Sequence, residues 1–369
     1  MKACHLFALS LLGLVSIAHA DLSSSIEKLR AVDREGKGNA EATAAWKEIA
    51  KSDAGALTQI LAGMNGANPL AENWLRVAAG VVAEKAAKGN GISVDSLVAF
   101  LQDTKNAPAP RVLAFDLIRK SKPEESEKLA MSLLGDPSSE LRRYPVTKLI
   151  EEAEAALSAG KKDAAGDTYQ KALVAARDED QIKSIAKKLR ELDRTVDLPK
   201  HFGFLMRWQL IAPFTNVERK GFDEVFPPEK EVNLTASYPG KGGDAKWVPF
   251  ESKDDYGMID FNKPFTMLKE VTGYAYTEFN SAEARDAQIR IGCKNGWKVW
   301  LNGELLFARD EYHRGMKLDQ YKLPCHLKAG RNRILVKCCQ NEQTESWTVE
   351  WQFQLRICDA TGTAIAEAK

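Results

Sequence analysis

The chain has 369 residues, and its 52 basic and 51 acidic side chains leave a formal net charge of +1. A charge balance this close to zero gives no reason to expect nucleic acid or an anionic membrane surface as the partner. The length exceeds one ordinary hydrophobic core and predicts two or three domains.

The start of the chain has the pattern of a secretory signal peptide, residues 1–20. Lys2 supplies the positive start, residues 6–17 form an apolar stretch too short to span a bilayer, and Ala18-His19-Ala20 matches the small-x-small cleavage pattern. The alternative, a buried N-terminal helix, does not explain why the uncharged run ends at this pattern. We therefore expect cleavage after Ala20 and an extracytoplasmic protein, periplasmic or secreted. No later segment is apolar enough over sufficient length to insert into a membrane.

Residues 21–198 are predicted to form short antiparallel helices. Apolar residues recur at three-to-four spacing, for example Leu57, Ile60 and Leu61, and connectors containing Gly, Asn and Pro interrupt the pattern. The last helix is expected to end near Pro199, because proline cannot continue a helix.

Two families of helical repeats resemble parts of this region. An arginine followed by an apolar turn recurs at Arg76, Arg111 and Arg142, at intervals of 35 and 31 residues, and residues 135–142 resemble the entry to the second helix of a HEAT repeat. Residues 153–178 resemble half of a tetratricopeptide repeat. Either resemblance implies an α-solenoid, in which each helical hairpin packs against its neighbours. The three arginines either line a concave binding surface or link adjacent helices.

Residues 199–360 are predicted to form an antiparallel β-sandwich, because aromatic residues become dense and apolar residues alternate with polar ones. The clearest alternation runs over residues 347–358 and places Trp347 and Trp351 in the core. Residues 361–369 are expected to form a frayed tail. The predicted strands are residues 204–212, 231–237, 246–251, 257–261, 271–279, 287–293, 297–301, 305–307, 333–339 and 347–358.

A hairpin within this region carries a resemblance to a known family. Its first strand alternates through Trp297 and Val299, and Asn302-Gly303 supplies the positive φ angles of a type I′ turn. The order W-x-V-W-L-N-G, variable loop, L-K-x-G-x-N-x-I-L-V-K resembles the galactose-binding-like jelly-roll domains of secreted bacterial carbohydrate-active proteins. The resemblance covers about residues 202–360. Because its turns belong to the scaffold, it implies a fold more strongly than a sugar ligand.

Five cysteines follow the predicted cleavage site, and their number is informative. An odd count in an exported chain predicts at least one free thiol or an intermolecular bond. Neighbouring cysteines on one strand face opposite sides, and Cys338 lies on the apolar side. Small buried side chains with one bridge are favoured over a redox role. The pairing is open among Cys293, Cys325, Cys338, Cys339 and Cys358.

The charged insert at residues 309–315 is the best candidate for a ligand site. It joins two predicted strands and concentrates donors, acceptors and an aromatic ring, the set that a sugar with vicinal hydroxyls requires. The alternative is that these charges pair with one another and fix the loop to the sandwich or to the helical domain. Trp300 is either a stacking platform or covered by the helical domain. The candidate residues are Arg309, Asp310, Tyr312, His313, Arg314, Asp319, Gln320, Trp300, Gln340, Asn341 and Glu342, with Trp347 beside the last three.

The sequence predicts neither a catalytic centre nor a cofactor. The motifs of serine hydrolases, zinc peptidases, P-loop proteins and dinucleotide-binding enzymes do not occur in it. Asp254 and Asp255 with Asp260 suggest a structural calcium ion, but they do not match an EF-hand loop, and solvated acids are the favoured interpretation.

These observations predict an exported, non-catalytic binding protein. Its architecture, an α-solenoid followed by a β-sandwich, resembles secreted bacterial proteins that join HEAT-like or tetratricopeptide-like repeats to a galactose-binding-like domain. The first hypothesis is recognition of a carbohydrate or polysaccharide through the rim loops of the sandwich. The alternatives are a protein-interaction scaffold that uses the helical groove and an accessory or divergent carbohydrate-active enzyme.

Overall fold

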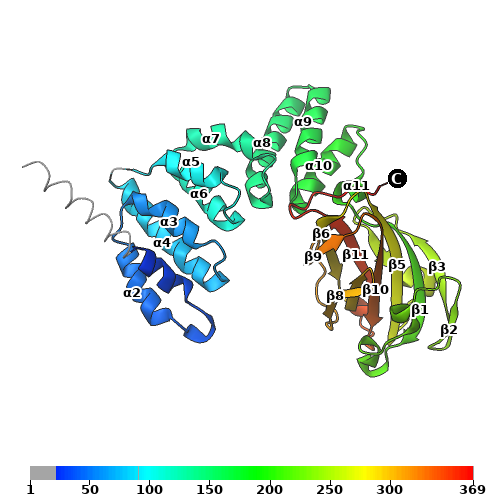
Figure 1. Ribbon diagram of the computed structural model, residues 1–369. Helices are drawn as coiled ribbons and strands as arrows, with labels where there is room; N and C mark the ends of the chain where they lie inside the picture. Colours follow the sequence, from blue (N-terminus) through cyan, green and yellow to red (C-terminus); the bar gives the residue numbers. More distant parts are fainter. Residues whose placement is uncertain (1–21, 90, 369) are drawn as a thin grey trace, which may run out of the picture. The chain divides into compact units, whose positions relative to one another are not determined.

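The computed structural model describes residues 22–89 and 91–368, and the predicted signal peptide lies outside these ranges. The chain divides into two compact units, Met1–Lys148 and Leu149–Lys369. The change from helices to strands lies further along the chain, between residues 202 and 207, so the second unit contains both helices and sheets. The colours in Figure 1 follow the sequence, so most helices run from blue to green and the strands from green to red.

Helices make up the first unit. Proline stands at the start of three of them, where its missing N–H costs no helical hydrogen bond. Asn68 caps one start by accepting hydrogen bonds from the backbone N–H groups of Leu70 and Ala71, each at 3.0 Å. The helices comprise residues 22–30, α2 Asn39–Ile49, α3 Leu57–Gly63, α4 Pro69–Ala87, α5 Val94–Gln102, α6 Pro108–Ser121, α7 Pro123–Ala130 and the first part of α8 Ser139–Ser158.

Of the three arginines that recur in this region, Arg111 links distant segments of the chain. Arg111, only 2 % exposed, forms a bidentate ion pair with Asp136, at 3.0 and 2.5 Å, and donates to the Leu101 carbonyl. Arg76 pairs with Glu72 on the surface of α4, and Arg142 donates to the Asp136 carbonyl. Arg111 therefore anchors α6 to the turn before α8 and does not line a binding surface.

The second unit begins with the end of α8, followed by α9 Lys162–Ala175, α10 Glu179–Glu191 and the short α11 Leu198–Phe202. Helices α9 and α10 pack against each other through buried residues such as Tyr169, Ile182 and Leu189. Gly203, in the left-handed conformation at φ 77°, ends α11, and the first strand follows.

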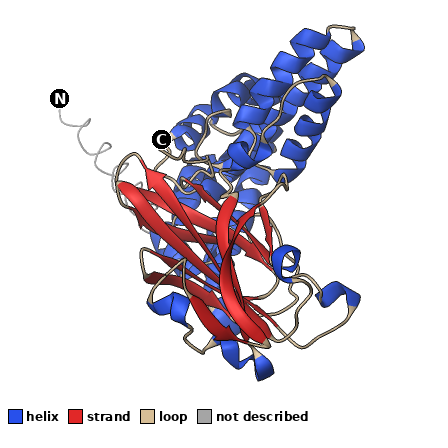
Figure 2. Ribbon diagram, turned by 90° about the vertical axis from the view of Figure 1, so that its right-hand side faces the viewer, coloured by secondary structure: helices blue, strands red, loops and turns tan. Residues whose placement is uncertain are grey.

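Two antiparallel sheets form the rest of this unit, and Figure 2 shows their strands in red as one block. Neither strand order closes on itself, so each of the two sheets is open at both ends. The seven-stranded sheet has the order β2 Ser237–Gly240, β3 Gly243–Glu251, β1 Arg207–Thr215, β5 Val271–Ser281, β10 Gly330–Gln340, β7 Gly296–Leu301 and β8 Glu304–Arg309. The four-stranded sheet has the order β4 Met258–Asp260, β11 Gln352–Cys358, β6 Arg285–Cys293 and β9 Tyr321–Leu327.

One hydrophobic core lies between the two sheets. Val336 and Val299 contribute from the seven-stranded sheet, and Ile289 and Leu355 from the four-stranded sheet, all at 0 % exposure. Burying such an aliphatic side chain stabilises the fold by roughly 1.5–3 kcal/mol. The period-two pattern that predicted these strands is therefore the pattern of this shared core.

The prediction for residues 347–358 was wrong at its start. Strand β11 begins only at Gln352, and Ser346–Thr348 forms a 3-10 turn in which Thr348 bonds to Glu345 through both its N–H and its hydroxyl, each at 2.8 Å. Trp347 is consequently 60 % exposed, whereas Trp351 is buried against Phe261. An alternating sequence pattern cannot predict such side-chain hydrogen bonds, which compete with strand pairing.

Three further predictions need correction. Residues 231–237 do not form a strand; β2 starts at Ser237. Strand β9 was not predicted; it contains Pro324, which is tolerated there because β9 is an edge strand. The tail is not frayed: Ile365 donates to the Ile357 carbonyl, and Ala368 donates to the Asn280 carbonyl.

The five cysteines of the second unit are free thiols. Cys338 faces the core between the sheets, with its sulfur 3.9 Å from that of Cys293, and Cys339 faces the other side next to Thr272. The predicted opposite orientation of the neighbouring cysteines is confirmed.

Candidate functional site

The predicted ligand loop connects the two sheets at one end of the sandwich. It leaves β8 of the seven-stranded sheet after Arg309 and enters β9 of the four-stranded sheet at Tyr321. Two of its residues, His313 and Asp319, have positive φ angles of 56° and 55°. Left-handed backbone at a residue other than glycine costs on the order of 1–3 kcal/mol and persists only where surrounding contacts fix it.

The charged residues of this loop mostly satisfy one another. Glu311 accepts from Arg309 at 2.5 Å and from Arg314 at 2.8 and 2.9 Å, and all three side chains are at least partly exposed. Hydrogen bonds from Arg309 and then Arg314 lower the pKa of Glu311. Asp310 differs, because partial burial and the nearby charge of Asp223 raise its pKa.

Tyr312 and His313 turn toward other segments. Asn216 donates to the Tyr312 hydroxyl at 3.1 Å, and the guanidinium of Arg219 lies 5.2 Å from the centre of the Tyr312 ring. The His313 Nε2 atom lies 2.7 Å from Asn341 Oδ1, and its ring meets Trp347 edge-on at 5.7 Å. The loop and the segment after β10, predicted as two clusters, therefore lie side by side.

We call the resulting patch the rim surface: Arg219, Tyr312, His313, Glu342 and Trp347. Its polar pair is a bidentate contact in which Arg219 donates to Glu342 at 2.6 and 3.2 Å. Trp347, at 60 % exposure, lies against the His313 ring in the same patch. The rim surface thus combines an open aromatic face with charged donors and acceptors.

Sequence reasoning missed Arg219 and Asn216. They lie in and just before the 3-10 helix Val217–Phe222, more than 90 residues before the loop that they contact. Glu218 and Arg219 both have positive φ angles, 56° and 62°. Nothing in the local sequence pattern indicates this conformation, because it depends on the distant partners Glu342 and Tyr312.

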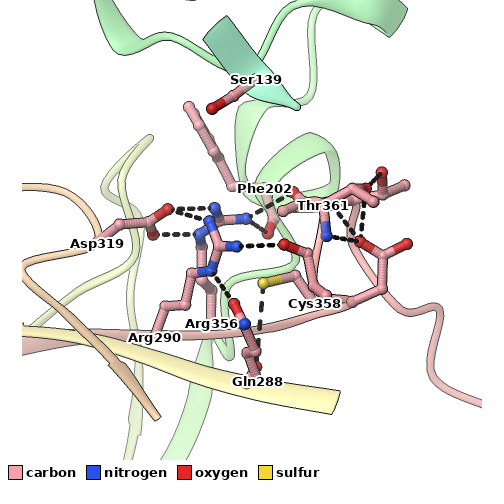
Figure 3. Close-up of polar contacts among 12 residues, drawn as sticks. Ser139, Phe202, Gln288, Arg290, Asp319, Arg356, Cys358 and Thr361 are labelled. Carbon is pink, nitrogen blue, oxygen red and sulfur yellow. Dashed lines mark hydrogen bonds and ion pairs between the residues drawn. The ribbon is translucent and has the colours of Figure 1, made fainter. Parts of the chain in front are cut away.

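Several predicted ligand residues are occupied inside the fold. Figure 3 shows Asp319 between two arginines. Arg290 donates to one carboxylate oxygen at 2.5 Å, and Arg356 donates to both oxygens at 2.6 Å each. Arg356 also donates to the Phe202 and Gly362 carbonyls, which ties α11 and the chain's end to the sheet. Burial alone raises the pKa of Asp319, but the bonds and charges of the two arginines outweigh it and lower the pKa.

The buried amides are likewise occupied. Gln340, at 0 % exposure, donates to the carbonyls of residues 348–350, and Asn341 is also fully buried. Gln320 accepts from the Cys293 N–H at 3.2 Å. Gln340, Asn341 and Asp319 therefore hold the scaffold in place, whereas Gln320 is only partly buried and stays a predicted ligand residue. Trp300 lies elsewhere, half-buried on the outer face of the seven-stranded sheet.

The three acids considered for calcium have separate roles. Asp254 accepts from the Tyr256 N–H at 2.8 Å, Asp255 pairs with Arg190 at 2.7 Å, and Asp260 accepts from the Asn262 N–H at 2.9 Å. Within residues 22–89 and 91–368, no group of three or more His, Cys, Asp or Glu side chains is arranged to hold a metal ion. No helix in the same ranges is sufficiently long and apolar to cross a membrane.

The scaffold hypothesis concerns the helices. On α4, Leu70, Trp74, Val77 and Val81 follow one another at helical spacing and form one stripe, in which Leu70 and Val77 are 43 % and 54 % exposed. The stripe carries no feature that specifies a partner, and a protein-binding role stays a prediction.

Comparison with known proteins gives little further information. No family model matches the sequence, and no curated protein matches it. Among solved structures, a GH31 α-xylosidase from Xanthomonas citri has a TM-score of 0.21 at 8 % identity over 31 % of this chain and 15 % of the enzyme. A β-glucosidase from Kluyveromyces marxianus has a TM-score of 0.26 at 10 % identity over 76 % of this chain and 35 % of the enzyme. The chain spans about a third or less of these enzymes, and TM-scores this low carry no argument.

Proposed function

We propose that the protein is an exported, non-catalytic carbohydrate-binding protein. In this proposal the two sheets are a galactose-binding-like jelly roll, the helices are a HEAT-like or tetratricopeptide-like solenoid, and the ligand is a glycan held at the rim surface. The observation that carries the proposal is Trp347, a large aromatic ring left 60 % exposed beside polar side chains.

An exposed tryptophan in this setting suits a sugar ring. The apolar side of a pyranose stacks on an indole face, while its hydroxyls bond to side chains at the edge. His313 meets the indole edge-on and restricts its orientation, which lowers the entropy lost on binding. The Arg219–Glu342 pair supplies donors and acceptors within the same surface. The strained backbone at residues 218, 219 and 313 supports a functional role for this surface.

The carboxylates of the rim favour binding over hydrolysis. A glycosidase needs one carboxylic acid whose pKa is raised so that it can protonate the leaving group. Arginine contacts lower the pKa of Glu311, and the hydrogen bond from Arg219 lowers that of Glu342. Only Asp310 among the loop acids has a raised pKa. Hydrolysis of any glycan that is lost in Asp310→Asn would therefore contradict the non-catalytic proposal.

Affinity electrophoresis of the mature chain through gels containing different polysaccharides tests the binding proposal. We expect retardation by at least one polysaccharide and about a tenfold weaker affinity for Trp347→Ala, the loss of roughly 1.4 kcal/mol. Trp347→Phe should retain part of the affinity because it keeps a ring. Val174→Ala, a substitution at a 65 % exposed apolar side chain on α9, is the control. Equal retardation of Trp347→Ala and the unsubstituted chain, or no retardation by any polysaccharide, would contradict the role of the rim surface.

A further inference from the structure

The outer face of the seven-stranded sheet carries a second surface with the features of a binding site. The strand registers align Pro249 of β3, Gln209 of β1, Tyr276 of β5, Leu335 of β10 and Trp300 of β7 in one row across the sheet. All five side chains project to the face opposite the shared core. The row crosses four inter-strand spacings, or about 19 Å at about 4.8 Å each.

Two cavities lie along this row. One has a volume of about 600 Å³ and is lined by Gln209, Pro249 and Tyr276, and the other has about 220 Å³ and is lined by Trp300 and Leu335. The segment 228–234 forms a wall along both, with Leu234 at the first and Val232 at the second. The larger cavity falls within the roughly 300–1,000 Å³ typical of ligand pockets, and the smaller one falls below that range. We call this surface the transverse groove.

A row of charged residues runs parallel to the row from Pro249 to Trp300. Glu251, Arg207, Glu278 and Arg333 occupy neighbouring strands and alternate in sign. Glu278 accepts from the Tyr276 hydroxyl at 2.5 Å, and Glu251 pairs with Lys253 at 2.9 Å.

Three other donor side chains of the groove, in contrast, have no partner within it. Among residues 22–89 and 91–368, the side chains of Arg207, Gln209 and Arg333 have no hydrogen-bond or ion-pair partner, although the first two line the larger cavity and Arg333 lines the smaller. Unpaired donors that line a hollow are available to a ligand. These side chains can therefore donate hydrogen bonds to acceptors of a ligand in the groove.

We propose that the transverse groove binds a short, uncharged oligosaccharide that lies across the strands. The alternating charges give the groove no strong preference for an anion or a cation, whereas hydroxyl groups accept from arginine and amide donors and donate to carboxylates. The ring of Trp300, half-buried in the same row, provides an apolar contact for a sugar face.

The groove and the rim surface are separate. On β10, Arg333 lies near the groove and Gln340 at the rim end, seven residues apart, which is roughly 23 Å at about 3.3 Å per residue. The groove proposal shares a ligand class with the proposed function but does not depend on the rim surface. Substitutions at one surface therefore report on that surface alone.

Isothermal titration of the mature chain with short neutral oligosaccharides, and with uronate oligosaccharides of matched length, tests the groove. We expect a neutral oligosaccharide to bind and Arg207→Ala and Trp300→Ala each to weaken its affinity about tenfold. Gln209→Ala, a milder change in the same row, should weaken it in the same direction. Arg285→Ala, on β6 of the other sheet, is the control and should bind normally. Thermal melting establishes that each variant is folded.

The variants distinguish failure of the groove from failure of the rim. Loss of affinity in Trp347→Ala, with Arg207→Ala, Gln209→Ala and Trp300→Ala unchanged, would overturn the groove and leave the rim surface in place. Binding of uronate oligosaccharides alone, weakened by added salt, would overturn the assignment of an uncharged ligand. If no oligosaccharide binds, the groove proposal is also overturned. This outcome does not depend on whether polysaccharide gels retard the chain through the rim surface.

Discussion

The connection between β8 and β9 contains two acids, each held between two arginines, and they differ in almost everything except charge. Asp319 lies between Arg290 and Arg356, whose side chains are 7 % and 4 % exposed. Glu311 lies eight residues earlier between Arg309 and Arg314, whose side chains are 41 % and 63 % exposed.

The difference shows that burial, more than charge pattern, decides what such a group does. At the surface, water solvates each charge and salt screens it, so the pairing around Glu311 contributes little. Inside the fold, three desolvated charges depend on one another, and removing one leaves the others without compensation. Asp319 therefore belongs to the scaffold, whereas the Glu311 group stays accessible to solvent.

Asp319→Asn should be the most damaging substitution of this pair of groups. It leaves Arg290 and Arg356 as buried, uncompensated cations and is expected to lower the free energy of unfolding of the second unit by about 3–5 kcal/mol. Denaturant titration followed by tryptophan fluorescence measures this, because six of the eight tryptophans lie in the second unit. Asp286→Asn, at a side chain 98 % exposed, is the matched control.

A triple substitution sharpens the same test. Arg290→Met, Asp319→Leu and Arg356→Met together remove all three buried charges and should cost less than Asp319→Asn alone, because no charge is left unpaired. A loss for Asp319→Asn no larger than for Asp286→Asn would contradict the importance of burial.

The sequence predicts the core of the sandwich better than its polar groups. Alternation along β10 places Ile334 and Val336 on the core face, and the structure has them there, because apolar periodicity and burial have the same physical cause. Local hydrogen bonds and edge positions override the pattern, as at Trp347 and Pro324.

The sequence predicts where the candidate loop lies but not the partners of its side chains. Density of charge and loop position singled out residues 309–315, and that loop does lie at the rim. The partners that separate Asp319 from Glu311 come from residues 290 and 356, far away in the chain. Charge composition alone gives no measure of desolvation, so the sequence treats the two acids alike.

His201, whose pKa is influenced by Arg356 of the buried Asp319 group, allows the effect of burial to be tested by changing the pH. Desolvation, and then the charges of Arg177 and Arg356, lower its pKa from 6.5 to about 4. Between these two values the unfolded chain binds a proton that the folded chain does not. The free energy of unfolding should therefore fall by up to about 3 kcal/mol as the pH drops from 6.5 to 4.

His201→Gln checks this prediction by removing the titrating group. Unfolding titrations of both proteins at several pH values across this range should show a shallower decline for the variant. An identical decline in the two proteins would assign the acid sensitivity to other groups.

Glu311→Gln should have the smallest effect on stability. Its two arginine partners are exposed and regain water when the carboxylate is lost, so the denaturant midpoint should stay within repeat error at moderate salt. The substitution does change the donors that face solvent at the rim, because Arg309 and Arg314 lose their common carboxylate and keep only a neutral amide oxygen as an acceptor. A midpoint shift approaching that of Asp319→Asn would show that the outer group supports the fold, and the contrast between the two acids would then not rest on burial.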